Sequence, residues 1–234
     1  MSIILKRTTF LAAFTLSIGV SAVVANAQSA NDVDKMSFFI TSVGTGDGAN
    51  FGGLEGADAH CGTLASAAGS TKKWAAYLSS SMIIDRSSEG PPQITEGVNA
   101  RDRIGSGPWY NVKGELIAND VEHLHEDDVN INFESGLDEN GNSINKRGTR
   151  PTKHDILTGS DSHGYFSTAG GDTTCGNWTS NEAGSAIVGH HDRSGPLASR
   201  NFVSWNSSHP SRGCSDKALA SSGGAGLLYC FAVN

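Results

Sequence analysis

The chain has 234 residues, of which 37% are hydrophobic and 18% charged, and it carries a net charge of −7. This composition excludes a disordered acidic tail and a multi-span membrane protein, and the length suits one sizeable domain. A negative surface repels phosphate backbones and anionic lipid headgroups, so we expect no nucleic-acid partner. The 29 glycines indicate a fold with many tight turns.

The first residues have the pattern of an export signal. Lys6 and Arg7 precede an apolar stretch from Phe10 to Val24, and Ala25-Asn26-Ala27 provides a small-x-small cleavage site. The apolar stretch is shorter than the roughly 20 residues of a membrane span. We therefore interpret residues 1–27 as a signal peptide.

Cleavage there would start the mature protein near Gln28 and leave it without a membrane span. We expect an exported protein, located in the periplasm or outside the cell. Residues 28–35 would form a polar leader, and residues 36–234 a single domain. Loss of Lys6 and Arg7 takes the net charge from −7 to −9.

The domain reads as short elements separated by long loops. A strand is predicted at 36–43, and apolar residues at three- and four-residue steps predict a helix from Leu54 to Ala68, ended by Gly69. β-forming residues predict further strands at 74–78, 114–118, 154–159, 185–191 and 226–233.

The remaining segments are predicted to be loops, turns and one short helix. Residues 87–93 and 105–111 read as loop and turn, Asn99 can cap a short turn through Ile104, and Asn119 or Asp120 can cap a short helix over 121–125. Residues 126–152 are rich in polar residues and predict a surface excursion, with a hairpin at Asn140-Gly141. The fold class indicated is α+β.

Four cysteines accompany this pattern: Cys61, Cys175, Cys214 and Cys230. An even number in an exported chain predicts two disulfides, for which three connectivities are open. There is no CxxC pair, so zinc ribbons and thioredoxin-type redox motifs are not indicated.

Two groups of residues are candidates for ligand binding. The first is the run His190, His191, Asp192 and Arg193, which can bind a metal or an anion or move protons, or can be a polar strand end. The second combines ring, amide and imidazole groups suited to a sugar: Asn177, Trp178, Trp205, Asn206 and His209. The alternative for the two tryptophans is a place in the core.

The acidic region offers a candidate calcium site. Carboxylate and amide oxygens on loops suit Ca²⁺, and the residues selected are Asp127, Asp128, Asn130 and Asp138. The alternative is a solvated acidic loop. His123 and His125 are two residues apart and would not share a helical face for zinc.

No sequence motif selects a catalytic site. There is no GxSxG elbow, P-loop or HExxH. His154-Asp155 is an isolated pair, typical of a structural role.

Several segments together resemble the C-type-lectin-like superfold, and within it the endostatin-like domains at the ends of some collagens. They are GADAHCGTLASAAG with WAAYLSS, VNARDRIGSGPWYNVKGEL, HDILTGSDSHG with TTCGNWTS, and RGCSDKAL with GLLYCFAV, which span most of residues 36–234. The chain is similar also to exported bacterial proteins labelled "lectin". The resemblance implies two nested disulfides, Cys61–Cys230 and Cys175–Cys214.

The sequence departs from the functional motifs of these families. The new N-terminus has no His for the endostatin zinc site, and the acidic surface does not suit heparan sulfate. Trp205-Asn206-Ser207 has Ser where calcium-dependent lectins have the ligating Asp, and no Glu-Pro-Asn loop is present. Fold alone does not fix the ligand.

These observations favour an exported, non-enzymatic binding module whose partner is a glycan or an extracellular protein. One alternative is a calcium-binding structural or assembly protein of the cell surface. A second is a secreted hydrolase that uses His190, His191 or Asp192.

Overall fold

The computed structural model describes residues 35–87, 89–197, 199 and 201–233. The predicted signal peptide lies outside these residues, as does the predicted leader except for Lys35. Among the described residues, none of the helices combines the length and the apolar character that crossing a bilayer requires. The described structure is α+β and contains two disulfides.

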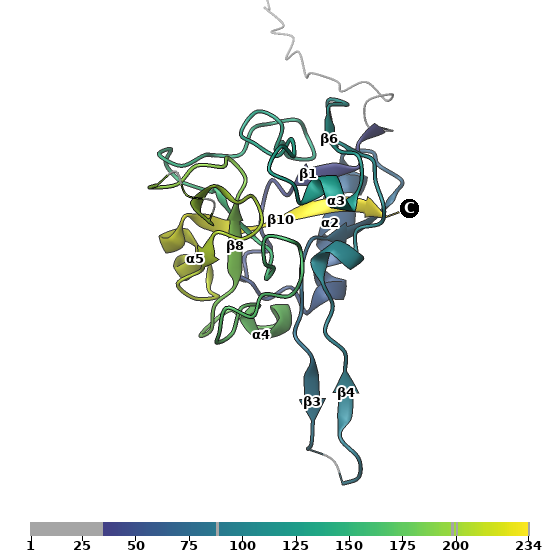
Figure 1. Cartoon of the computed structure of the whole chain (residues 1–234), viewed down its shortest axis with the longest axis vertical. Coiled ribbons are helices and arrows are strands. Elements are labelled where there is room, and N and C mark those ends of the chain that lie inside the picture. Colours follow the sequence, from purple (N-terminus) through teal and green to yellow (C-terminus); the bar gives the residue numbers. More distant parts are fainter. Residues whose placement is uncertain (1–34, 88, 198, 200, 234) are drawn as a thin grey trace, which may run out of the picture.

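The main sheet is built around the last strand, β10, which forms its long central member (Figure 1). Its strands are β1 (Phe38–Ile40), β2 (Lys73–Ala76), β7 (Asp155–Leu157), β8 (Ile187–His190), β9 (His209–Pro210) and β10 (Gly224–Val233). The C-terminal half of β10 pairs antiparallel with β1 and β2, and its N-terminal half pairs parallel with β7. β8 and β9 extend the sheet beyond β7 by antiparallel pairing.

Side chains of β10 alternate between two separate cores because successive residues of a strand point to opposite faces. Leu228, Cys230 and Ala232 belong to one core. Leu227, Tyr229 and Phe231 belong to the other. One strand therefore anchors the packing on both faces of the sheet.

The first core is covered by helix α2 (Leu54–Ala67), which lies against β2 and β10. Its buried residues are small, Ala57, Cys61 and Ala65, so the helix backbone can approach the sheet closely. Cys61 is joined to Cys230 of β10. The helix predicted from Leu54 to Ala68 is confirmed, with its end one residue earlier.

The second core is mainly aromatic. The Phe231 ring lies 5.0 Å from the Phe38 ring and 5.2 Å from the Trp109 ring, measured between centroids. Trp205 packs 4.9 Å from Tyr77 and 5.1 Å from Tyr229. These rings supply both apolar area and favourable edge-to-face contacts.

The rest of the fold consists of short helices and two further strand pairs. These helices are η1 (Ala100–Asp102), α3 (Val121–Leu124), α4 (Cys175–Trp178), η2 (Asn201–Val203) and α5 (Asp216–Ser222), and β5 (Trp109–Tyr110) pairs with β6 (Leu116–Ala118). Of the two predicted caps for α3, Asp120 is the one used, since its side chain accepts a hydrogen bond from His123 N. The strands expected at 36–43, 74–78, 114–118, 154–159, 185–191 and 226–233 are all present, most of them shorter.

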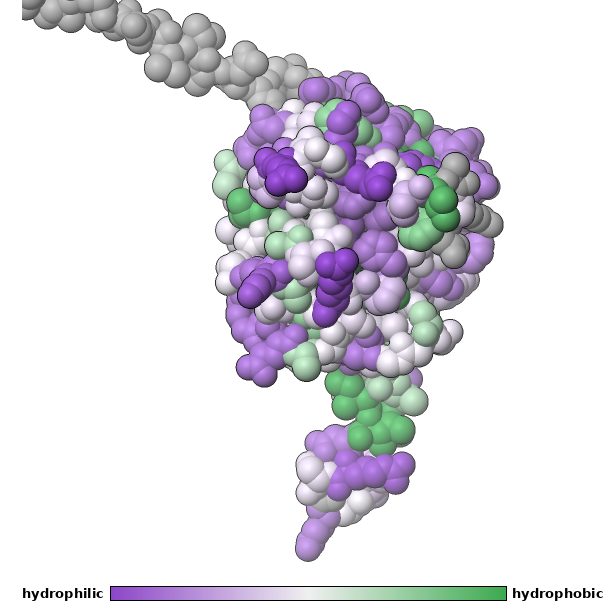
Figure 2. Space-filling view, turned by 90° about the vertical axis from the view of Figure 1, so that its left-hand side faces the viewer, coloured by the Kyte–Doolittle hydropathy of each residue, from purple (hydrophilic) through white to green (hydrophobic). Residues whose placement is uncertain are grey.

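A protruding hairpin surrounds the loop predicted at residues 87–93. Its strands are β3 (Ile83–Asp85) and β4 (Gln93–Thr95), and it extends away from the rest of the molecule in Figure 1. Its apolar residues Met82, Ile83, Ile84 and Ile94 are exposed, and hydrophobic surface gathers at its base in Figure 2. The loop predicted at residues 87–93 is confirmed up to Gln93, where β4 begins, but the two strands beside it were not predicted.

The acidic segment 126–152 is not simply a surface excursion, as the sequence predicted. Val129, Ile131, Leu137 and Ile144 are buried in the cores. The predicted Asn140-Gly141 turn is present, with Leu137 bridged to Ser143 across it. Polar residues dominate the segment, but apolar residues at intervals fix it to the domain.

The disulfides are Cys61–Cys230 and Cys175–Cys214, the nested pairing that the resemblance implied. Their sequence separations are 169 and 39 residues. A longer closed loop removes more conformational entropy from the unfolded chain. The outer bridge therefore contributes more to the free energy of unfolding.

We predict that Cys175→Ser/Cys214→Ser lowers the free energy of unfolding by about 2–5 kcal/mol, and Cys61→Ser/Cys230→Ser by about 1 kcal/mol more. Urea denaturation of both double variants measures which of them loses more free energy of unfolding. A greater loss for the inner bridge would contradict the loop-length explanation.

We also predict that the hairpin is dispensable for stability, because β3 and β4 are exposed along their whole length. Replacing residues 84–94 with an Asn-Gly turn keeps the Ser80–Val98 bridge and should change the free energy of unfolding by less than about 1 kcal/mol. A loss above about 2 kcal/mol in urea denaturation would show that the hairpin supports the domain.

Candidate functional site

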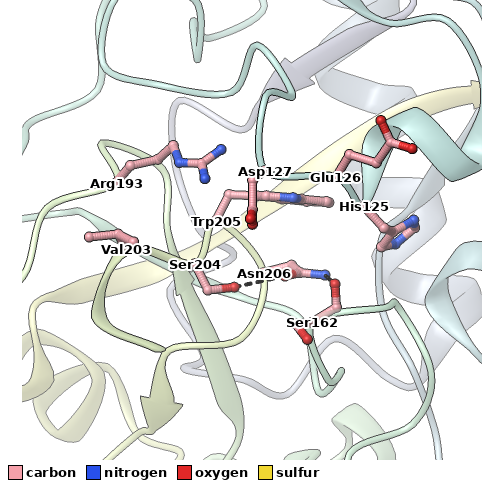
Figure 3. Close-up of a pocket in the computed structure, with 9 residues that line it drawn as sticks. All are labelled: His125, Glu126, Asp127, Ser162, Arg193, Val203, Ser204, Trp205 and Asn206. Carbon is pink, nitrogen blue, oxygen red and sulfur yellow. Dashed lines mark hydrogen bonds between the residues drawn. The ribbon is translucent and has the colours of Figure 1, made fainter. Parts of the chain in front are cut away.

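A polar hollow opens over the second core, between loops that are far apart in the sequence (Figure 3). Its lining consists of His125, Glu126, Asp127, Ser162, Arg193, Val203, Ser204, Trp205 and Asn206. The cavity volume is about 40 Å³, which admits water, a small ion or a single ligand hydroxyl.

Trp205 forms an apolar wall of the hollow but its ring is covered. The side chain is 3% exposed, packs between Tyr77 and Tyr229, and donates its indole N–H to Leu124 O at 3.1 Å. A covered ring cannot stack on a sugar. Trp205 therefore fixes the surrounding loops in place.

Asn206 forms the polar floor. Its amide nitrogen donates to Tyr77 Oη at 3.0 Å and to Asp161 O at 3.1 Å, and its amide oxygen accepts from Ser204 Oγ at 3.0 Å. Because a buried amide must satisfy its hydrogen bonds, this network fixes the Asn206 side chain in one orientation. The floor is rigid before any ligand arrives.

His125 continues this network toward the rim. Its Nδ1 donates to Val121 O at 2.6 Å, which leaves Nε2 to accept from Tyr77 Oη at 2.7 Å. Burial lowers the pKa of His125 to about 4, and it raises the pKa of Tyr77 well above its usual value. At neutral pH both side chains are uncharged.

A second hollow adjoins the first and shares His125, Glu126 and Asp127 with it. It extends to Arg101, Glu122 and His163, and its volume is about 420 Å³. Small-molecule sites occupy roughly 300–1,000 Å³. The larger hollow therefore has room for a sugar-sized ligand, and the smaller one for a group projecting from it.

The rim of the two hollows carries charges of both signs. Glu126 and Asp127 are exposed, and Arg101 forms an ion pair with Glu122 at 3.1 Å. The Arg101 guanidinium lies 5.0 Å from the centre of the Tyr165 ring, and this ring is 47% exposed. Carboxylates accept hydrogen bonds and guanidinium groups donate them, so the rim can contact hydroxyl groups from both sides.

Four residues selected from the sequence meet at this site: Asp127, Arg193, Trp205 and Asn206. Asp127 had been assigned to calcium and the other three to ligand binding. The backbone of Arg193 has a positive φ of 48°, and its guanidinium donates to Val129 O at 3.4 Å. The local turn thus directs this side chain across the hollow.

The predicted sugar-binding surface of Asn177, Trp178, Trp205, Asn206 and His209 does not form. Trp178 is fully buried and donates to Ser79 O at 2.8 Å, so it belongs to the core. Asn177 is used to hold Ser81, accepting from Ser81 N at 2.8 Å and donating to Ser81 O at 3.0 Å. The alternative, that Trp178 and Trp205 lie in the core, is correct.

The run from His190 to Arg193 does not form a single cluster either. His190 contacts Asp155 and His209, whereas His191 is fully buried and contacts neither of them. Burial lowers the pKa of His191 to about 4. Asp192 accepts from Arg147 N at 2.7 Å, so a joint catalytic site of His190, His191 and Asp192 is not supported.

The predicted calcium site is also not assembled. Among the described residues, no group of three carboxylates within reach of one ion includes Asp127, Asp128 or Asp138. Asp138 accepts from Asn140 N and Asn142 N and so holds the turn, and Asn130 Nδ2 donates to Leu116 O. These polar groups stabilise loops.

Sequence reasoning missed Tyr77, Arg101, Ser162 and His163. Tyr77 precedes His125 by 48 residues, and only the tertiary fold places its hydroxyl group between His125 and Asn206. No local motif marks such a position.

Two comparisons with known proteins found no relative. No protein-family model matches the chain, and no curated protein matches it significantly. Any function proposed for this chain therefore rests on the chemistry of its own residues.

We predict a pH dependence of stability from His125. Its pKa is about 4 in the folded chain and near 6.5 when unfolded, so the unfolded state binds more protons between these values. The contribution of neutral His125 to the free energy of unfolding is complete above about pH 6.5 and is lost as the pH falls toward 4. His125→Gln should therefore differ most from the unsubstituted chain near neutral pH, and less toward about pH 4.

Urea denaturation across this pH range measures the difference. Tyr77→Phe is the control, because it removes the hydroxyl partner of His125 but keeps the titrating ring. Its stability should still fall with pH. A difference between His125→Gln and the unsubstituted chain that stays constant with pH would contradict the prediction.

Proposed function

We propose that this chain is an exported, non-enzymatic binding module of C-type-lectin-like fold that recognises a hydroxyl-rich ligand, such as a glycan. The observation that carries the proposal is the pair of adjoining hollows. Segments distant in the sequence bring His125 and Asp127 together with Arg193 there, over the floor formed by Asn206.

The floor supports recognition because it is already ordered. Tyr77, His125 and Asn206 satisfy one another, so binding would not need to immobilise them. Preorganisation of this kind lowers the entropic cost of association. The small hollow would receive one projecting hydroxyl group of the ligand.

The rim supports a polar, uncharged ligand. Glu126, Asp127, Arg101 and Arg193 present acceptors and donors at the two hollows, and the exposed Tyr165 ring lies next to Arg101. Sugar hydroxyls can act as donor and acceptor at once, which matches such a mixed rim. A strongly anionic ligand would meet the acidic surface of a chain with net charge −7.

Two further observations support the fold and the export. The resemblance implied two nested bridges, and the structure has Cys61–Cys230 and Cys175–Cys214. Helix α2 also precedes β2, and the last cysteine lies on β10, as in the segments that carry the resemblance. Disulfides persist in oxidising compartments. They agree with the signal peptide predicted at residues 1–27.

The test is a glycan-array screen of the purified protein, repeated with calcium and with a chelator, followed by titration of any ligand found. Asp127→Asn and Arg193→Gln should each weaken binding roughly tenfold or more, because each removes a charge-assisted hydrogen bond. Glu134→Gln is the matched control, on an exposed residue outside both hollows. It should bind with unchanged affinity.

Binding that is unaffected by the chelator is expected, since the predicted calcium ligands do not assemble. A ligand whose affinity is unchanged in both Asp127→Asn and Arg193→Gln would place recognition elsewhere. Absence of binding to any glycan would contradict the proposal and favour a protein partner.

A further inference from the structure

We propose that His154, Asp155, His190 and His209 form a binding site for a transition-metal ion, with Zn²⁺ as the best match. These residues lie outside both hollows, where β7, β8 and β9 meet. The proposal is independent of the glycan-binding function.

The sheet register brings the four side chains together. Asp155 of β7 pairs directly with His190 of β8, and His209 of β9 pairs with Val188, two residues before His190. Side chains two apart on a strand share a face, so Asp155, His190 and His209 lie on one face. His154 joins them by stacking on the His190 ring, with a centroid separation of 4.2 Å.

The ligand atoms of His154, Asp155 and His190 all lie within 4.8 Å of one another, and His209 lies beside them. Asp155 Oδ1 lies 3.0 Å from His154 Nε2, 3.3 Å from His190 Nε2 and 3.8 Å from His209 Nε2. His190 Nε2 and His209 Nε2 are 3.1 Å apart. Zinc bonds of about 2.0–2.1 Å in a tetrahedron place ligand atoms roughly 3.3 Å from one another.

Each imidazole is held by its other nitrogen. His190 Nδ1 donates to Phe202 O at 2.7 Å and His209 Nδ1 to Pro210 O at 3.0 Å, and His154 Nδ1 lies 3.2 Å from Asp192 Oδ1. A carbonyl oxygen only accepts, so the first two Nδ1 atoms carry the hydrogen. The Nε2 atoms of these neutral rings then direct lone pairs into the cluster, as in metal-binding histidines.

With the His190 and His209 rings both neutral and protonated on Nδ1, hydrogen bonding does not account for this arrangement. Two Nε2 lone pairs facing each other at 3.1 Å repel unless a cation or a proton lies between them. Both oxygens of Asp155 are buried, and the polar atoms close to Oδ1 are imidazole nitrogens, His154 Nε2 at 3.0 Å and His190 Nε2 at 3.3 Å. A buried carboxylate needs compensation for its charge, and a bound cation provides it.

Glycine keeps space open beside the ligands. A Cβ at Gly223 would lie 3.2 Å from His154 Nε2 and 3.4 Å from Asp155 Oδ1. Gly223 has a φ of 121°, which other residues rarely adopt. His209 is the most exposed member of the cluster, with 30% of its side chain accessible, and offers the side from which an ion can enter.

The ligand set selects the kind of metal. Imidazole nitrogens suit zinc, copper and nickel, whereas Ca²⁺ and Mg²⁺ prefer oxygen ligands. Three nitrogens and one carboxylate oxygen therefore favour Zn²⁺ over Ca²⁺. Four protein ligands would close a tetrahedral site, as in structural zinc centres.

The test is metal binding to the chelator-treated full chain. We expect one Zn²⁺ per chain by elemental analysis after dialysis, and Co²⁺ should give the intense visible absorption of tetrahedral coordination. Zn²⁺ should also raise the melting temperature by at least about 5 °C at saturating concentration. Ca²⁺ should produce none of these effects.

His209→Ala removes the ligand nearest to solvent and should weaken Zn²⁺ binding about 100-fold or more, without loss of the fold. Asp155→Asn should alter the Co²⁺ spectrum. His60→Ala is the matched control, because this histidine of α2 lies outside the cluster. It should bind Zn²⁺ with unchanged affinity.

Less than about 0.1 Zn²⁺ per chain, or Zn²⁺ affinity unchanged in His209→Ala, would overturn the proposal. The cluster would then be a buried ion-pair network in which a protonated His154 joins Asp155 to Asp192. If a variant fails to fold, the Co²⁺ spectrum of the unsubstituted chain still tests the proposal. A spectrum typical of octahedral Co²⁺, or no Co²⁺ absorption at all, would contradict the proposed ligand set.

Discussion

The alternation of side chains along β10 is the constraint on which the rest of the structure depends. Because Leu228, Cys230 and Ala232 face one core and Leu227, Tyr229 and Phe231 face the other, this strand cannot shift by one residue without exchanging the two cores. Its pairing also places the hollows and the histidine cluster. Tyr229 supports the Trp205 wall of the hollows, and the parallel partner β7 begins with Asp155 of the histidine cluster.

Local patterns in the sequence predicted helix α2 and five strands of the main sheet, because α2 has apolar residues at three- and four-residue steps and these strands are rich in β-forming residues, whereas the two-residue β9 was not predicted. The β3–β4 hairpin was missed because its strands are only three residues long and are exposed along their whole length. The acidic segment was misjudged because its polar residues hide the few apolar ones that anchor it, among them Ile131 and Leu137. Composition describes a segment as a whole, whereas packing depends on single positions.

The sites were much harder to predict than the fold. Asp127, Arg193, Trp205 and Asn206 were selected from the sequence and line one hollow, but their burial could not be read from residue type. His190 was grouped with its neighbour His191, although strand geometry separates them. Its actual companions, His154 and Asp155, lie more than thirty residues earlier and had seemed an isolated pair. Pairings across a sheet depend on register, which a single sequence does not display.

The outer disulfide gives the chain the topology of a covalent ring. Cys61 and Cys230 enclose almost every described element after β1, including the exposed hairpin and the loops of both sites. A protease that cuts once inside this ring, for instance near the hairpin tip, produces two pieces that remain joined until the bridge is reduced. The exposed segments can thus be nicked without the release of a fragment.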